Sequence, residues 1–223
     1  MNGHQAGPAN RPTRKLDSLY AECMNCPNTV TECPGIWKDI ADGLPPRGFH
    51  YETAPVEVLA VAKNPGHPLS WERDRYRGHR GTDLLEAYQI FKEDFYSRVQ
   101  REKGHTFHKN LFRYLSLLLD VDETEVYQRA AHTNLVKCST RAEQDRLQLQ
   151  TLEECYRRYF RHELALLAPQ VLLALGREAA GFLHSLEWEW GIPVIYIRHP
   201  SVHYPKAEEQ EILFHPYKAE FWR

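Results

Sequence analysis

Four short runs of apolar and β-branched residues recur along this chain, and each is shorter than an ordinary helix. They occupy residues 56–62, 131–137, 170–176 and 192–198, and longer helix-like stretches separate them. Near-continuous apolar runs that alternate with helices are typical of a parallel sheet covered on both faces. The sequence therefore predicts an α/β fold, a three-layer α/β/α sandwich around a four-stranded, mainly parallel central sheet.

A polar residue or a glycine lies within, at the end of or just after each run. Asn64 follows the first run, Asn134 lies in the second, Gly176 ends the third and His199 follows the fourth. In open sheets of this class, the ligand crevice lies beyond the carboxyl ends of the strands. We therefore expect these four residues to meet at one edge of the sheet.

Apolar residues spaced three and four apart predict the helices. The stretch from Leu84 to Phe95 has this pattern, and Thr82 is its expected N-cap. Further helices are predicted over 16–26, 106–119, 122–129, 147–167 and 177–186 and near the C-terminus. Residues 1–15 are polar with glycine and proline, which predicts a disordered tail. Residues 16–223 are expected to form a single domain whose N-terminal segment, 16–55, carries cysteines.

The overall charge and hydropathy limit the partners of the chain. The formal net charge is −2, so a nucleic acid would have to be held by local basic patches rather than a global field. No apolar run approaches the roughly 20 residues that cross a bilayer, and the N-terminus lacks an apolar signal core. We expect an intracellular, cytoplasmic monomer that has no membrane partner.

The chain has 5 cysteines, which in a reducing compartment favour metal binding or catalysis over disulfides. Cys23 and Cys26 form a C-x-x-C pair, a spacing that suits one metal centre. Together with Cys138 and Cys155 they would build a four-thiolate site for a [4Fe–4S] cluster or, as the less favoured alternative, zinc. Two alternatives stay open: Cys138 and Cys155 are buried apolar residues, or Cys33 replaces one of the four ligands.

Several motifs occur in a characteristic order. They are the C-x-x-C pair, the stretch from Val61 to Gly66, an arginine-rich loop leading into Leu84-Leu85, Thr133-Asn134-Leu135-Val136-Lys137-Cys138, Cys155 in a helix that ends at Pro169, the stretch from Val171 to Ala179, and His199-Pro200-Ser201. Any one of them is weak evidence. In this order they resemble the uracil-DNA glycosylase superfamily, and especially its iron–sulfur branch, the family-four type.

Two departures from that branch leave the range of substrates open. The iron–sulfur branch usually has Gly-Glu-Ala-Pro-Gly where this chain has Ala-Lys-Asn-Pro-Gly, at residues 62–66. The Asn-Pro-Gly turn is more similar to the mismatch-specific and single-strand-selective branches. Ser139-Thr140-Arg141 also stands where the branch usually has Arg-Pro-Pro. Uracil, hypoxanthine and xanthine are therefore all candidate bases.

The resemblance implies a DNA repair hydrolase that cleaves the N-glycosidic bond of uracil or a related deaminated base and leaves an abasic site. Asn64 would orient the attacking water, and His199 would donate a hydrogen bond to O2 of the departing pyrimidine. Asn134 would contact the O4 and N3–H edge of the base, with Gly66 and a stacking aromatic, Tyr76, completing the site. The structural alternatives are a turn asparagine, a buried histidine, an asparagine bonded at a strand end and a surface tyrosine.

The resemblance also implies contacts with DNA. The residues predicted to make them are Arg73, Arg75, Arg77, Arg80, Lys137, Ser201, Val202 and His203. The arginine-rich loop and Lys137 would bind phosphates, and the residues after the His-Pro turn would fill the space left by an extruded base. The alternative for the charged residues is a solvated surface. Two alternatives for the whole protein are a catalytically silent iron–sulfur DNA-binding protein of the same fold and a zinc-stabilised enzyme acting on free nucleosides.

Overall fold

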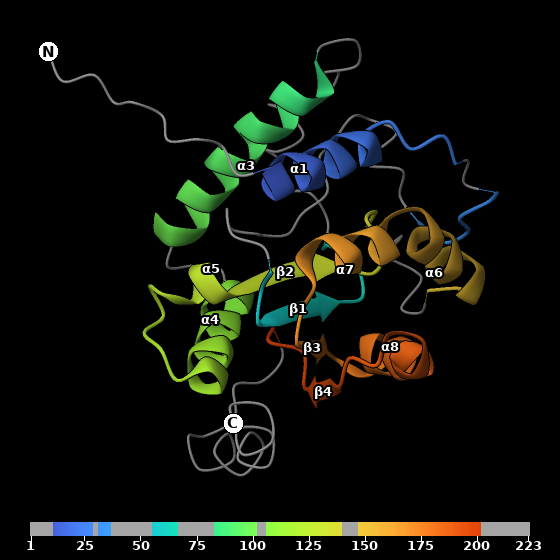
Figure 1. The fold of residues 1–223 in the computed structure, drawn as a ribbon. Helices are drawn as coiled ribbons and strands as arrows, with labels where there is room; N and C mark the ends of the chain where they lie inside the picture. The colour runs from blue at the N-terminus through green and yellow to red at the C-terminus, as the bar shows by residue number, and fades with distance from the viewer. Residues whose placement is uncertain are drawn as a thin grey trace, which may run out of the picture.

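The computed structural model describes residues 11–28, 31–36, 55–66, 83–101, 106–139 and 147–201. At its centre are four strands, β1 (Val58–Ala62), β2 (Ala130–Asn134), β3 (Val171–Leu175) and β4 (Val194–Ile197). Their order in the sheet is β2-β1-β3-β4, and every neighbouring pair is parallel (Figure 1). The predicted four-stranded sheet is confirmed, and it is parallel throughout.

Helices cover both faces of the sheet. The core on one face contains side chains of α1 (Arg11–Cys23), α8 (Arg177–Trp190) and a long helix made of α6 (Leu149–Cys155), a π-helical turn η2 (Tyr156–Phe160) and α7 (Arg161–Leu167). The helix α3 (Leu84–Arg101) packs on α1 and extends this core. The other face packs against α4 (Thr106–Leu119) and α5 (Val126–Arg129). Alternate strand residues supply the two cores: Leu59 and Val61 face one, while Val58, Ala60 and Ala62 face the other.

Several helix boundaries differ from the predicted ones. The first helix begins at Arg11, so residues 11–15, which were assigned to the tail, are helical. Asp83 caps α3, because its Oδ1 accepts hydrogen bonds from the N–H groups of Leu85 at 2.9 Å and Glu86 at 3.3 Å; Thr82, the predicted cap, lies outside the described residues. The helix predicted over 122–129 shortens to α5, α8 runs on to Trp190, and the predicted C-terminal helix lies outside the described residues.

The strand order reverses direction between β1 and β3, since the chain places β2 on one side of β1 and β3 on the other. In parallel sheets such a switch point opens a crevice at the carboxyl ends of the two strands. The ends are level here: Ala62 pairs with both Asn134 and Leu175, and Leu175 pairs with Ile197. The four turns that follow the strands therefore lie side by side.

None of the described helices is both long enough and apolar enough to cross a lipid bilayer.

Candidate active site

The four strand-end turns form one continuous edge. The N–H groups of Leu135 and Val136 donate to the carbonyls of Ala62 and Lys63 at 2.9 and 3.0 Å, which ties the turn after β2 to the turn after β1. On the other side, Gly176 donates its N–H to the Ile197 carbonyl at 2.9 Å. Backbone hydrogen bonds thus hold the segments that carry Asn64, Asn134 and His199 in fixed relative positions.

His199 lies half-buried two residues after β4, and its surroundings define its protonation. The backbone N–H of Ser201 donates to Nδ1 at 3.3 Å, and a ring nitrogen that accepts a hydrogen bond carries no proton, so the neutral ring has its proton on Nε2. Burial, and then the nearby positive charge of Lys63, lower the pKa of His199. The site therefore presents a neutral imidazole with Nε2–H as a hydrogen-bond donor.

Gly176 allows the turn after β3 to lie against His199. Its backbone has φ 96° and ψ 164°, a region that only glycine occupies readily. A Cβ added to Gly176 would lie 3.5 Å from the Cβ of His199. The expectation that these two residues meet is confirmed, and the backbone conformation explains why the position holds glycine.

Asn134 ends β2 and is 3% exposed. Strand alternation gives it the same face as His132, which packs on the Phe107 ring with the ring centroids 5.2 Å apart. Phe107, from α4, also packs on His199 at 5.3 Å. His132 in the middle of β2 and His199, two residues after β4, therefore contact a common aromatic side chain.

Asn64 and Gly66 lie in the turn after β1. Asn64 is half-buried, and its amide nitrogen donates to the Pro65 carbonyl at 2.9 Å. Gly66 is exposed, and its carbonyl accepts a hydrogen bond from the Ser139 hydroxyl at 2.9 Å. The turn is thus fastened to the segment after β2, with Asn64 at the edge of the sheet where the prediction put it.

The prediction that Lys137 contacts DNA is wrong. Its side chain is 1% exposed and its Nζ lies 2.6 Å from Oε2 of Glu163, which is itself 0% exposed. The same Nζ donates to the Thr133 hydroxyl at 2.8 Å and to the Asn134 carbonyl at 2.6 Å. A lysine enclosed in this way cannot reach a phosphate, and it supports the backbone beneath Asn134 instead.

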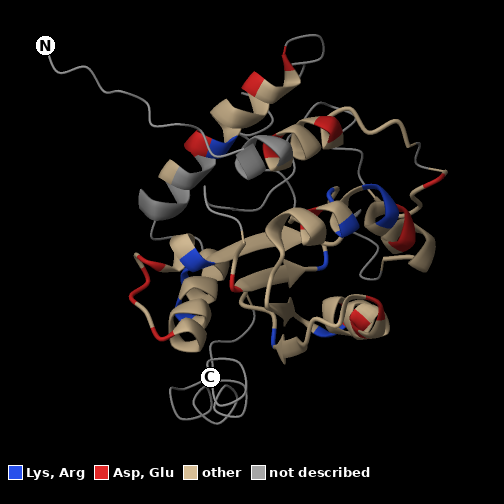
Figure 2. Ribbon diagram, in the orientation of Figure 1, with Lys and Arg blue, Asp and Glu red and all other residues tan. Residues whose placement is uncertain are grey.

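Most of the other predicted DNA contacts lie outside the described residues: Arg73, Arg75, Arg77, Arg80, Val202 and His203. The predicted stacking aromatic, Tyr76, also lies outside them. Ser201 is described and exposed. The prediction overlooked Arg177 and Arg198, which are exposed and directly follow Gly176 and β4. Their position directly after a strand end was the sequence feature that could have identified them. Figure 2 shows lysine and arginine spread over several helices and turns of the described chain.

The cysteines gather at one end of the core. Cys23 ends α1, Cys138 follows β2 and Cys155 ends α6; these three and Cys33 are buried in one apolar cluster, against which Cys26 packs. The thiol of Cys155 interacts electrostatically with those of Cys26 and Cys33, and burial raises its pKa to about 12. Burial likewise raises the pKa of Cys23, which has Cys26 and Cys155 as neighbours.

This donor set suits a thiolate-bound metal, although the side chains are not in ligating positions. Within the part of the chain that the structure describes, no three His, Cys, Asp or Glu side chains are arranged to hold one metal ion. Binding would require the thiols to turn toward one another and lose their protons. The [4Fe–4S] cluster therefore stays a prediction.

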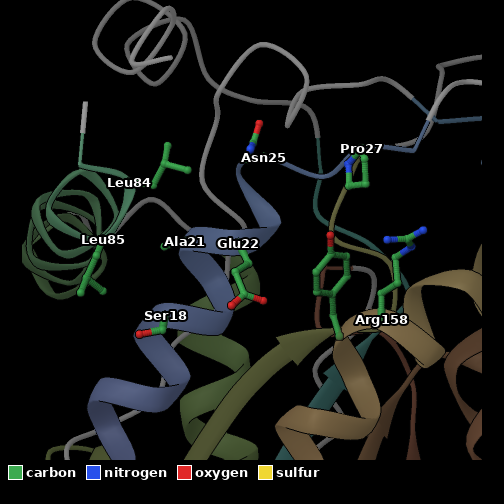
Figure 3. Close-up of a pocket in the computed structure, with 9 residues that line it drawn as sticks. Ser18, Ala21, Glu22, Asn25, Pro27, Leu84, Leu85 and Arg158 are labelled. Carbon is green, nitrogen blue, oxygen red and sulfur yellow. The ribbon is translucent and has the colours of Figure 1, made fainter. Parts of the chain in front are cut away.

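A separate pocket of about 500 Å³ lies beside the cysteine-bearing end of α1 (Figure 3). Its lining residues are Ser18, Ala21, Glu22, Asn25, Pro27, Leu84, Leu85, Arg158 and Tyr159. None of them belongs to the strand-end turns. Tyr159 links the pocket to the cysteines through a hydrogen bond with Cys26, and burial raises the pKa of its hydroxyl.

Comparison with known families gives a match over the part of the chain that contains the sheet. The sequence model of the uracil DNA glycosylase superfamily matches residues 56–222, which include all four strands and the turns after them. The cysteine-bearing helix α1 precedes the matched region. Comparison with curated proteins gives no significant match. On the strength of the family match, this chain belongs to the uracil DNA glycosylase superfamily.

Proposed function

We propose that this protein is a monofunctional uracil-DNA glycosylase that hydrolyses the N-glycosidic bond of uracil, or of a related deaminated base, in DNA. The observation that carries the proposal is the state of His199. It is a neutral imidazole with Nε2–H, fixed next to the switch point of the sheet by Ser201, Gly176 and Phe107. Membership of the superfamily supports a DNA substrate.

Cleavage of the glycosidic bond leaves negative charge on the departing base, and stabilising that charge is the role we assign to His199. A donor held in place before the reaction costs no reorganisation in the transition state. The lowered pKa of His199 keeps the ring neutral, so the base leaves as an anion that accepts a hydrogen bond, and His199 is not required to transfer its proton. Loss of one such donor typically lowers kcat by about 10²–10³-fold.

Asn64 and Asn134 have separate roles in the proposal. Asn64 orients the attacking water through its amide, which cannot deprotonate water, so the proton that the water loses passes to the departed base anion or to solvent. The contribution of Asn64 is therefore smaller than that of His199. Asn134 offers both a donor and an acceptor to the O4 and N3–H edge of uracil. Cytosine has the reverse pattern and would leave buried polar groups unpaired, which excludes it strongly.

The base has to leave the helical stack before these residues can contact it, as is general for glycosylases. Arg177 and Arg198 are exposed at the edge of the sheet and are placed to contact phosphates around the extruded nucleotide. The net charge of −2 means that such local contacts, rather than the whole surface, hold the DNA.

The test uses labelled oligonucleotides that carry uracil, hypoxanthine or xanthine, in single and double strands, followed by alkaline cleavage at abasic sites. We expect release of at least uracil. His199→Ala should lower kcat by about 10²–10³-fold, whereas His184→Ala, which removes an exposed histidine of α8, should leave it unchanged. If no abasic product forms from any base while the protein still binds DNA, the protein is the catalytically silent alternative.

The proposal includes a [4Fe–4S] cluster held by Cys23, Cys26, Cys138 and Cys155, which would fasten the end of α1 to α6. The chemistry of the donor set and its burial support this, as does the proximity of the Cys23 and Cys155 thiols. Cys33 is the competing fourth ligand, because its thiol interacts with Cys26.

Anaerobic purification with iron and sulfide analysis tests the cluster. We expect about four irons per chain, loss of iron in Cys138→Ser, and retention of iron in Cys33→Ser. The opposite result for the two variants would make Cys33 the fourth ligand. A colourless protein that contains zinc would support the zinc alternative, and a protein without either metal would mean that the thiols only pack in the core.

A further inference from the structure

Asn110 is a buried polar residue on the core face of α4, a place where apolar side chains are the rule. It is 8% exposed, and its amide nitrogen donates to the carbonyl of Pro200 at 2.7 Å. A carbonyl can only accept, so the nitrogen of the amide and not its oxygen faces Pro200. This bond fastens α4 to the turn that directly follows His199.

The peptide unit that accepts from Asn110 is also the one that fixes the His199 ring. Its carbonyl belongs to Pro200 and its N–H to Ser201, and that N–H donates to His199 Nδ1 at 3.3 Å. A peptide unit is planar and rigid, so fixing its carbonyl also fixes the direction of its N–H. Donation to the carbonyl further polarises the unit and strengthens the N–H as a donor.

A second contact from the same helix acts on the same ring. Phe107 lies one turn before Asn110 on α4, and its ring packs on the imidazole at 5.3 Å between centroids. Residues three apart on a helix share one face. Thus α4 fixes the plane of the imidazole through Phe107 and its rotation through Asn110 and the peptide.

We propose that Asn110 is a positioning residue for the glycosylase reaction: through the Pro200–Ser201 peptide it holds His199 in the Nε2–H tautomer and aims that N–H at the departing base. The proposal rests on the proposed function of His199. Asn110 itself does not contact the base. Its removal should lower kcat and leave KM nearly unchanged, because base recognition by Asn134 is not affected.

The experiment compares Asn110→Ala and Asn110→Leu with the wild-type protein. We expect both to lower the single-turnover rate on uracil-containing DNA by about 10–100-fold, as is typical when a catalytic group is misplaced. Asn110→Leu keeps the position filled and helical, so it serves if Asn110→Ala proves too unstable. The control is Ser116→Ala, which removes a hydroxyl of the same helix that donates to the Val121 carbonyl at 2.5 Å; its rate should equal that of the wild type.

Two readouts separate positioning from a loss of stability. In ¹⁵N–¹H correlation spectra, the wild-type His199 ring should show a single Nε2–H tautomer, and the Asn110 variants a mixture. In a His199→Ala background, adding Asn110→Leu should produce no further loss of rate. A single unchanged tautomer, an unchanged rate, or a full additional loss in that background would each overturn the proposal. The tautomer can be measured without any substrate, so a wild-type protein that releases no base would defeat the proposed function and leave this test intact.

Discussion

Replacing Lys137 with methionine tests whether this lysine contacts DNA, as predicted from the sequence, or is the buried partner of Glu163, as in the structure. In the structure, Lys137 Nζ donates to both Glu163 oxygens, at 2.6 and 2.8 Å, as well as to Thr133 and the Asn134 carbonyl. Methionine fills a similar volume and donates nothing. The Glu163 carboxylate, 0% exposed, would then be buried without its cation.

Breaking a buried ion pair by removing one partner costs about 3–5 kcal/mol, and the complete enclosure of this pair favours the upper half of that range. With an m-value of about 2 kcal/mol per molar, a loss of about 4 kcal/mol moves the urea midpoint down by roughly 2 M. Lys137→Met combined with Glu163→Leu should cost less than either single variant, about 1–3 kcal/mol, because only the Asn134 carbonyl and its polar neighbours then lose partners.

The assay is urea unfolding followed by circular dichroism, with DNA affinity measured at several salt concentrations. We expect a large loss of stability in Lys137→Met and an unchanged slope of log K against log salt. A phosphate contact would give the opposite pattern, with intact stability and a slope smaller by about 0.9 for duplex DNA. A cost below about 1 kcal/mol, or additive effects in the double variant, would refute the buried-pair argument.

Three further predictions concern stability. Gly176→Ala should destabilise the protein by about 1–3 kcal/mol because alanine avoids φ 96°. Gly181→Ala is the matched control: it lies in the exposed part of α8 with open space around the new methyl, and it should stabilise the protein by about 0.5–1 kcal/mol. Equal denaturation midpoints for the two variants would contradict the argument from φ. Asp83→Ala should cost about 0.5–2 kcal/mol through loss of the α3 cap, and no change in midpoint would mean that the cap contributes nothing. Burial lowers the pKa of His132 and of His199, so the unfolded chain binds more protons than the folded one. The free energy of unfolding should therefore fall as the pH drops below about 6.5, by at most about 1.4 kcal/mol per pH unit for each ring. His132→Gln should flatten this pH dependence in unfolding curves measured between pH 5 and 7, and an unchanged slope would contradict the prediction.

The elements that could be predicted from sequence are those whose signal is local and periodic. Each predicted strand end lies within three residues of the observed one, because continuous apolar runs mark buried strands. The helix α4 was predicted with its observed bounds, because burial of one face fixes the spacing of its apolar residues. The meeting of Gly176 and His199 followed from the rule that parallel strands end at one edge. This prediction depended on the parallel arrangement of the strands and not on a local motif.

What could not be predicted depends on partners far away in the chain. Lys137 next to Asn134 resembles a surface cation until Glu163, 26 residues later, is seen to lie against it. The role of Asn110 likewise requires Pro200, 90 residues away. Thr82 and Asp83 both suit an N-cap, and sequence alone does not choose between adjacent candidates. The one available signal was the presence of a polar residue, Asn110, in an apolar helix face.

The π-helical turn η2 has a consequence for the alignment of two buried side chains. Cys155 and Glu163 are eight residues apart on the helix that contains the turn. An α-helix advances about 100° per residue, and a π-helical turn absorbs one additional residue. The two positions therefore align like residues seven apart, on a single stripe facing the core. Deleting one residue from 156–160 should straighten the helix and preserve this alignment, whereas deleting residue 161 or 162, between the turn and Glu163, should rotate Glu163 away from Lys137 by about 100°. The bulge therefore accommodates one more residue between the two inward-facing groups than an uninterrupted α-helix of the same alignment would.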